Sequence, residues 1–314
     1  MYLFSNIIGV FVFDDRFNVI DEILFRNIEY YQNRNEFIEK IKSKHKYVKD
    51  TDEEALQKIL LYFKDYKFFG DFYNKNIQLT KFDIKNSVKD DILLIQAINS
   101  INGIGKSINF LVKNLREWYD LHNPEFSRAT ESHEDFVKNI MENGKEELLK
   151  KLSIKIFESV GADLEQENLE PIKSLAHQVY DLYQLKKDQF NYISTLMDDL
   201  CPNLKAVADV LVGAKLIEHA GSLKRLSEMP SSTIQILGAE KALFRHMKTG
   251  AKPPRHGVIV NHPLIASAPD KMHGKIARAL ADKISIAAKV DYFKGKFIGD
   301  KLRKELEDKV NKSK

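Results

Sequence analysis

The chain has 314 residues, more than a single hydrophobic core usually serves, so one small domain is excluded. It is 43% hydrophobic and 30% charged with 14 glycines and 8 prolines, which excludes a disordered or fibrous protein. The one cysteine, Cys201, can form neither an internal disulfide nor a cysteine-based zinc site. We therefore expect two or three folded domains in a reducing compartment.

Charge divides the chain into an acidic front and a basic back. The formal net charge is only +4, but residues 205–314 contain 22 Lys and Arg against 11 Asp and Glu. A basic half favours a phosphate-bearing partner, although a solvated lysine-rich surface is the commoner meaning of such a pattern. The longest apolar run near the start, residues 7–13, is too short for a membrane span and lacks the features of a signal peptide, so we expect no membrane association.

The first third predicts a small α/β domain. β-branched and aromatic residues at 2–4, 7–13 and 19–25, with a turn signal at Asp14-Asp15, predict strands and a hairpin. Polar helical sequence follows at 36–41, and residues 51–54 resemble a capping box before a second helix.

Apolar residues then recur at three- and four-residue spacing from Asp90 to Trp118, which predicts one long amphipathic helix. Gly103 and Gly105 indicate a bend or close packing within it. Residues 128–200 are rich in Glu, Lys, Leu and Gln, and we expect an antiparallel helical pair with one arm at 131–159 and a second that starts at Pro171. Such a pair cannot bury its own apolar stripe completely, so it predicts self-association.

The basic half predicts an all-helical domain. Helices are expected at 204–219, 223–229, 238–247 and 270–290, with a loop rich in Pro, Lys and His at 251–263. The fold class is therefore mainly α, with a small α/β domain, a long coiled-coil pair and a helical C-terminal domain.

Cofactor and metal motifs are weak. Gly105-Lys106-Ser107 resembles the end of a phosphate-binding loop, but Ser100 stands where that motif needs glycine, and no other glycine-rich loop occurs. The acidic group around His133 and the histidines at 246, 256, 262 and 273 match no metal-ligand spacing. We expect no catalytic residue, no cofactor and no metal, although a metal-dependent nuclease remains an alternative.

The most informative stretch is residues 232–246. Gly238 allows close backbone approach, and the helix start behind it offers N–H groups to an anion. Lys241 and Arg245 project from one helix face, next to Gln235, Ala239, Glu240 and His246. The alternative is an ordinary capped helix with a solvated basic face and with Leu237, Leu243 and Phe244 in the core.

Two further elements are basic. Lys248, Lys252, Arg255 and His256 lie in or beside a loop stiffened by two prolines, and Lys271, Lys275 and Arg278 follow i, i+4, i+7 on the next helix. Three successive basic elements suit the recognition of a structured RNA by its shape and phosphates.

At this point the sequence resembles the Nop domain family, and more fully the archaeal Nop proteins that accompany fibrillarin in box C/D ribonucleoproteins. The resemblance lies in residues 212–217, 219–223, 232–246, 252–257 and 262–265, and in Arg116-Glu117-Trp118-Tyr119. It implies that the RNA-contacting signature falls on Gly238, Ala239, Glu240 and Lys241, with Arg245 and His246 in the adjoining turn.

The resemblance also implies a non-catalytic scaffold. Its partners would be the fibrillarin methyltransferase, a small kink-turn-binding ribosomal-protein-like subunit, box C/D guide RNA with its target RNA, and a second copy of the chain. The implied division is a fibrillarin-binding region at 1–110, a coiled-coil dimerisation region at 111–202 and an RNA-binding Nop domain at 203–314. A spliceosomal-type Nop protein without fibrillarin is the nearest alternative.

The end of the chain bears on the organism that we expect. Eukaryotic relatives carry long Lys/Glu-rich tails, whereas this chain stops at Lys314. We therefore expect an archaeal protein located in the cytoplasm, or a nucleolar one if the source is eukaryotic.

Overall fold

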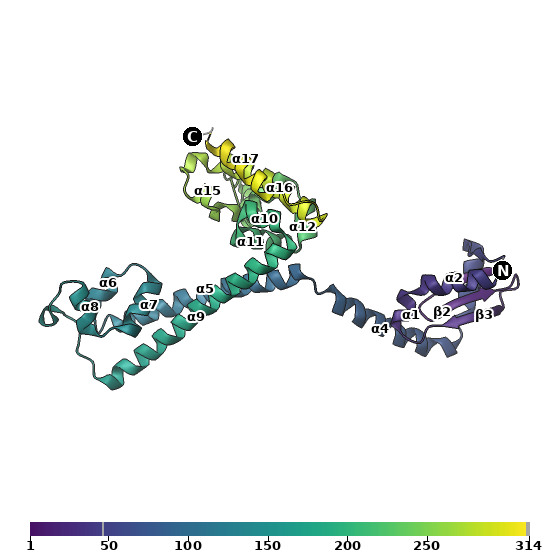
Figure 1. Ribbon diagram of the computed structural model, residues 1–314, viewed down its shortest axis with the longest axis horizontal. Helices are drawn as coiled ribbons and strands as arrows, with labels where there is room; N and C mark the ends of the chain where they lie inside the picture. The colour runs from purple at the N-terminus through teal and green to yellow at the C-terminus, as the bar shows by residue number, and fades with distance from the viewer. Residues whose placement is uncertain (46, 312–314) are drawn as a thin grey trace. The chain divides into compact units, whose positions relative to one another are not determined.

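The computed structural model describes residues 1–45 and 47–311, so the last three residues, which enter the expectation about the chain's end, lie outside the described part. The chain divides into two compact units, Met1–Lys89 and Asp90–Lys314 (Figure 1). None of the described helices is long and apolar enough to cross a membrane.

The first unit contains a small sheet with strand order β3-β2-β1-β4. Its strands are β1 (Tyr2–Ser5), β2 (Gly9–Phe13), β3 (Val19–Leu24) and the short β4 (Lys49–Asp50), and only β4 pairs in parallel. The predicted hairpin is confirmed, and its turn forms because Asp14 Oδ1 accepts hydrogen bonds from the backbone N–H groups of Arg16 and Asn18, each at 2.8 Å.

Helices cover both faces of this sheet. Alternate residues of β2 point to opposite sides, and both sets are apolar, so each face needs a covering helix. The helices are α1 (Ile28–Gln32), α2 (Arg34–Lys44), α3 (Glu53–Tyr62), the 3-10 turn η1 (Tyr66–Phe68) and α4 (Phe69–Ser87). Phe11 and Phe13 lie in one core cluster with Ile59 of α3, whereas Val10 and Val12 lie in another with Ile41 of α2. The predicted α/β fold is confirmed.

In the second unit, α5 (Asp90–Tyr119) pairs with α9 (Gln166–Leu200) over most of their length (Figure 1). The start of α5 shares a core cluster with the end of α9, including Ile98 and Ile193, while Leu115 near the end of α5 clusters with Ile172 near the start of α9. The two helices are therefore antiparallel. Gly103 and Gly105 do not interrupt α5, and a Cβ at Gly103 would meet nothing within 4 Å, so the prediction of close packing there is wrong.

The prediction of a single helical arm at 131–159 is also wrong. This region forms α6 (Pro124–Ala129), α7 (His133–Glu142), α8 (Lys145–Lys151) and the 3-10 turn η2 (Ile156–Glu158). The break after α7 falls at Asn143-Gly144, where the backbone is extended. Pro171 lies inside α9 rather than at its start, because α9 already begins at Gln166.

The C-terminal part of this unit is helical throughout the described residues, as predicted. Its elements are α10 (Pro202–Ala208), α11 (Val210–Ala220), α12 (Leu223–Glu228), α13 (Ser231–Ile236), α14 (Glu240–Thr249), the 3-10 turn η3 (Val258–Asn261), α15 (Pro263–Ala266), α16 (Asp270–Tyr292) and α17 (Gly299–Asn311). The helix predicted at 204–219 is interrupted at Asp209, whose φ is +61° and whose carboxylate accepts a hydrogen bond from Arg303 Nη1 at 3.0 Å. Helix α16 is the central element, with ten buried residues.

Candidate RNA interface

A tight turn at Gly238 joins α13 to α14. Gly238 has φ of +85°, and a Cβ at this position would come within 2.4 Å of Val258 Cγ2 and 3.2 Å of His219 Nε2. Both the backbone conformation and the space therefore require glycine. The Gly238 N–H donates to Glu240 Oε1 at 2.6 Å, so the Glu240 side chain braces the turn that precedes its own helix.

Helix α14 presents its cations to solvent. Lys241, Arg245 and Lys248 are exposed at i, i+4, i+7 spacing, and no ion pair to them is found among the described residues. The N-cap residue Ala239 makes no side-chain cap, so the first N–H groups of α14 keep the anion-binding capacity of a free helix start.

The inward side of the same helix is only half-buried, at Ala242, Leu243 and His246. None of its ten residues, all of them described, is buried, and Phe244 and Met247 are 56% and 65% exposed. The expectation that Phe244 lies in the core is wrong, whereas Leu237 is buried as predicted. A second positive-φ glycine, Gly250, ends the helix. Helix α14 thus exposes cationic and apolar side chains next to one another.

The loop at 251–257 is bonded to the Gly238 turn. Gln235 Nε2 donates to the Arg255 carbonyl oxygen at 2.7 Å, and Gln235 O and Leu237 O accept hydrogen bonds from Gly257 N and Val258 N, both at 2.8 Å. A Cβ on Gly257 would lie 1.9 Å from Leu237 O, so this position also requires glycine. Gln235 and Gly257 therefore hold the loop in place, a role the sequence signalled only through a glycine after the two prolines.

The loop also reaches the start of α16. Arg255 Nη1 forms an ion pair with Asp270 Oδ2 at 3.2 Å, and the rings of His256 and His273 meet at 5.8 Å. Burial and the neighbouring His273 lower the pKa of His256, so this ring is neutral at pH 7 and can offer hydrogen bonds but no charge. His246 likewise bonds to the Ala251 carbonyl oxygen and closes the end of α14.

The structure thus joins the turn, the loop and the start of α16 by direct contacts. Lys252 and Lys271 are exposed beside these contacts, and Lys275 and Arg278 continue along the exposed face of α16. Within the described residues there is no group of three His, Cys, Asp or Glu side chains that could hold a metal ion. The arrangement presents cations and free N–H groups, which are ligands for phosphates rather than catalytic groups.

A family model described as "Nop: snoRNA binding domain, fibrillarin" matches residues 100–312, more than half of the chain. The chain belongs to the Nop family. The match includes α14, the loop and α16, so the whole candidate interface lies within the Nop region.

Curated relatives carry names of the same family. An uncharacterized NOP5 family protein of Methanocaldococcus jannaschii is 41% identical over 81% of this chain and 64% of its own length. Nucleolar protein 58 of Aspergillus fumigatus is 38% identical over 65% of this chain and 37% of its own length, and nucleolar protein 56 of Schizosaccharomyces pombe is 34% identical over 77% and 54%. The Nop chain described here therefore spans less than two thirds of each of these relatives.

A solved fibrillarin/Nop5p complex contains a chain that resembles this one with a TM-score of 0.47 and 23% identity, covering 80% of each chain.

Proposed function

We propose that this chain is a non-catalytic scaffold of a box C/D ribonucleoprotein, which binds kink-turn guide RNA together with a small ribosomal-protein-like subunit. The observation that carries the proposal is the match of a snoRNA-binding family model to the region that holds the Gly238 turn and the exposed cations of α14. The chemistry of this surface suits phosphates and offers no catalytic group.

Helix α14 would make a joint site for RNA and protein. The free N–H groups at its start, with Lys241 and Arg245, would contact the RNA backbone, and Gly238 would let that backbone approach because it carries no side chain. Phe244 and Met247 are exposed on the same helix and would cover an apolar surface of the small subunit. The same helix would then bind the RNA and the small subunit at the same time.

The other regions would supply the remaining partners. Residues 1–110 would bind fibrillarin, residues 111–202 would associate with a second copy, and residues 203–314 would hold the guide RNA. Fibrillarin would then methylate a 2′-hydroxyl of the target RNA that pairs with the guide. The M. jannaschii and fungal relatives carry names from the same family, which supports this assignment.

The experiment is to replace Lys241 and Arg245 together by alanine and to measure the affinity for a kink-turn RNA that carries the small subunit. We expect about 10- to 100-fold weaker binding and a salt dependence reduced by about 1 to 2 in log–log slope, because two phosphates are no longer neutralised by the protein. Lys106→Ala with Lys113→Ala is the matched control, since both lysines are exposed on α5. Unchanged affinity of the α14 variant at fixed salt would refute the site.

Reconstitution tests the scaffold role. Methyl transfer by fibrillarin to a guide-matched RNA should require this chain, the small subunit and the guide, and the chain alone should neither cleave nor methylate RNA. Kink-turn RNA binding without fibrillarin binding would instead identify a spliceosomal-type Nop protein. Metal-dependent cleavage of RNA by the purified chain would favour the nuclease alternative.

A further inference from the structure

The connection between α16 and α17 exposes aromatic and cationic side chains next to one another. Phe293 is 75% exposed, Phe297 54% and Tyr292 36%. Lys289, Lys294 and Lys296 are also exposed, and no ion pair to them is found within the part of the chain that the structure describes. We call residues 292–297 the aromatic loop.

The aromatic loop is held rigidly at both ends. The one acidic residue of 289–297, Asp291, is buried, and its carboxylate accepts hydrogen bonds from Asn203 Nδ2 at 2.7 Å and Leu204 N at 2.8 Å. At the other end, Asn203 Oδ1 accepts a hydrogen bond from Ile298 N at 2.6 Å. The phenyl rings therefore stand in water on a fixed backbone, and no exposed carboxylate of this segment offsets its lysines.

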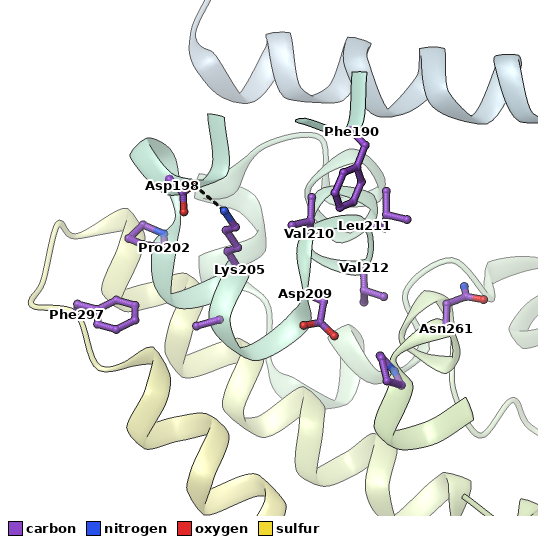
Figure 2. Close-up of a pocket in the computed structure, with 12 residues that line it drawn as sticks. Phe190, Asp198, Pro202, Lys205, Asp209, Val210, Leu211, Val212, Asn261 and Phe297 are labelled. Atoms are coloured by element: carbon purple, nitrogen blue, oxygen red, sulfur yellow. Dashed lines mark hydrogen bonds and ion pairs between the residues drawn. The ribbon is translucent and has the colours of Figure 1, made fainter. Parts of the chain in front are cut away.

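One wall of a pocket of about 600 Å³ is formed by Phe297 (Figure 2). Its other walls come from the end of α9, from α10 and α11, and from Asn261 at the end of η3. The two carboxylates in it are neutralised, Asp198 by Lys205 at 2.6 Å and Asp209 by Arg303 at 3.0 Å. Asn261 ends the same 3-10 turn, η3, that begins at Val258 beside Gly238, so η3 contributes both to this pocket and to the support of the Gly238 turn.

We propose that the aromatic loop is a second RNA-binding site, which takes unpaired nucleotides by stacking bases on Phe293 and Phe297 and holding phosphates with Lys294 and Lys296. Aromatic faces beside a basic track are the usual means of binding single strands without sequence preference. Aromatic residues are enriched at protein interfaces too, but lysine is depleted there, so the lysines of this loop favour RNA over a protein partner. The proposal rests on the proposed function in one respect, that the ligand is RNA.

The test uses the full chain and two probes, a 10-nucleotide oligouridine and the kink-turn RNA with the small subunit, with affinities measured by fluorescence anisotropy. Phe293→Ala and Phe297→Ala should each weaken oligouridine binding about 5- to 100-fold, whereas Phe293→Trp should preserve it. Lys294→Gln with Lys296→Gln should reduce the salt slope by about 0.7 for each phosphate that the variant no longer binds. Phe157→Ala is the matched control, because Phe157 is 77% exposed in the 3-10 turn η2.

The outcomes separate this proposal from the proposed function. If the chain binds the kink-turn RNA but not oligouridine, or binds oligouridine equally well after both phenylalanine substitutions, the second site is refuted and the Gly238 site stands. If it binds oligouridine through the aromatic loop but no kink-turn RNA, the proposed function fails and the second site stands. If the two substitutions change only the sedimentation of the chain, the loop is a contact between copies and the proposal is overturned.

Discussion

At the residue scale, two glycines with left-handed backbones flank α14, Gly238 before it and Gly250 after it, but only at Gly238 would a Cβ clash with its neighbours. Gly238 lies against Val258 and His219, whereas a Cβ on Gly250 would meet nothing within 4 Å. The same backbone conformation therefore has different consequences at the two positions.

Gly238→Ala should lower the free energy of unfolding by about 2 to 4 kcal/mol, because a left-handed alanine and a steric clash both oppose the native turn. Gly250→Ala, the control, should cost only about 1 kcal/mol, since the backbone conformation alone opposes it. Urea denaturation of the two variants measures the difference. Equal losses would mean that the clash of a Cβ at position 238 with Val258 and His219 does not contribute to the change in stability.

His262 is the buried titratable residue with the clearest consequence for pH. Its side chain is 1% exposed, its Nδ1 accepts a hydrogen bond from Leu264 N at 3.2 Å, and its Nε2 lies 3.3 Å from Asp209 Oδ2, a contact too poorly aligned to count as a hydrogen bond. Burial lowers the pKa of His262 in spite of the nearby carboxylate. The neutral ring is therefore the native form.

Because the unfolded histidine binds a proton below a pH of about 6.5 and the folded one resists it, stability should fall as the pH drops from about 7 towards the lowered folded pKa. His262→Asn keeps an acceptor for the Leu264 N–H and removes the titration, so it should flatten part of this decline. Thermal melts between pH 7 and 5 measure it. His122, His133 and His256 also have lowered pKa values and should retain the remaining slope, but an unaltered slope in the variant would contradict the role of His262.

At the scale of elements, the pairing of α5 with α9 depends on fully buried aliphatic side chains. Leu115→Ala should destabilise the chain by about 2 to 5 kcal/mol, because Leu115 is 0% exposed and its truncation leaves a cavity. Phe110→Ala on the same helix should change stability by less than about 0.5 kcal/mol, since Phe110 is 65% exposed. Circular dichroism melts compare the two, and similar losses would argue against this seam.

The identity of individual elements was predictable from the sequence, but their partners were not. Three- and four-residue spacing predicted α5, and β-branched and aromatic runs predicted the hairpin, because these patterns are local. The same composition at 131–159 predicted one helix, although Asn143-Gly144 breaks it. Its first piece, α7, does pack against α9 as predicted, but the main partner of α9 is α5. Helical periodicity shows which face is apolar and says nothing about which helix covers it.

In the candidate interface, too, the exposed residues were predictable from the sequence but their contacts were not. The exposed cations of α14 and α16 were predictable from spacing, whereas the two hydrogen bonds between Gln235 and the loop join residues 20 and 22 positions apart in the sequence. Whether the predicted residues contact RNA stays a prediction. The exposure of Phe293 and Phe297 was not predictable either, since aromatic residues near a helix end are usually packed.

At the scale of the whole molecule, the two units meet at an exposed, non-helical pair of residues. Val88 is 57% exposed and Lys89 is exposed between the end of α4 and the start of α5. Brief trypsin treatment should therefore cut first at Lys89 or at nearby Lys85 and leave two resistant fragments, identified by mass spectrometry. An earlier cut within α5 or α9 would contradict the division. The three functional regions bounded at 110 and 202 stay a prediction beside this structural division.

The lack of fully buried residues in α14 has a consequence for the stability of this helix. A ten-residue helix without a buried side chain gains little from packing, and isolated helices of this length are marginal in water. Its amide protons should therefore exchange with solvent far faster than those of α16. A partner that binds only the folded helix will bind more weakly when α14 is formed in only a fraction of the molecules. A first partner that orders the helix will therefore raise the affinity for a second partner. If RNA and the small subunit both bind α14 as proposed, cooperativity between them would be a property of this segment's own folding equilibrium.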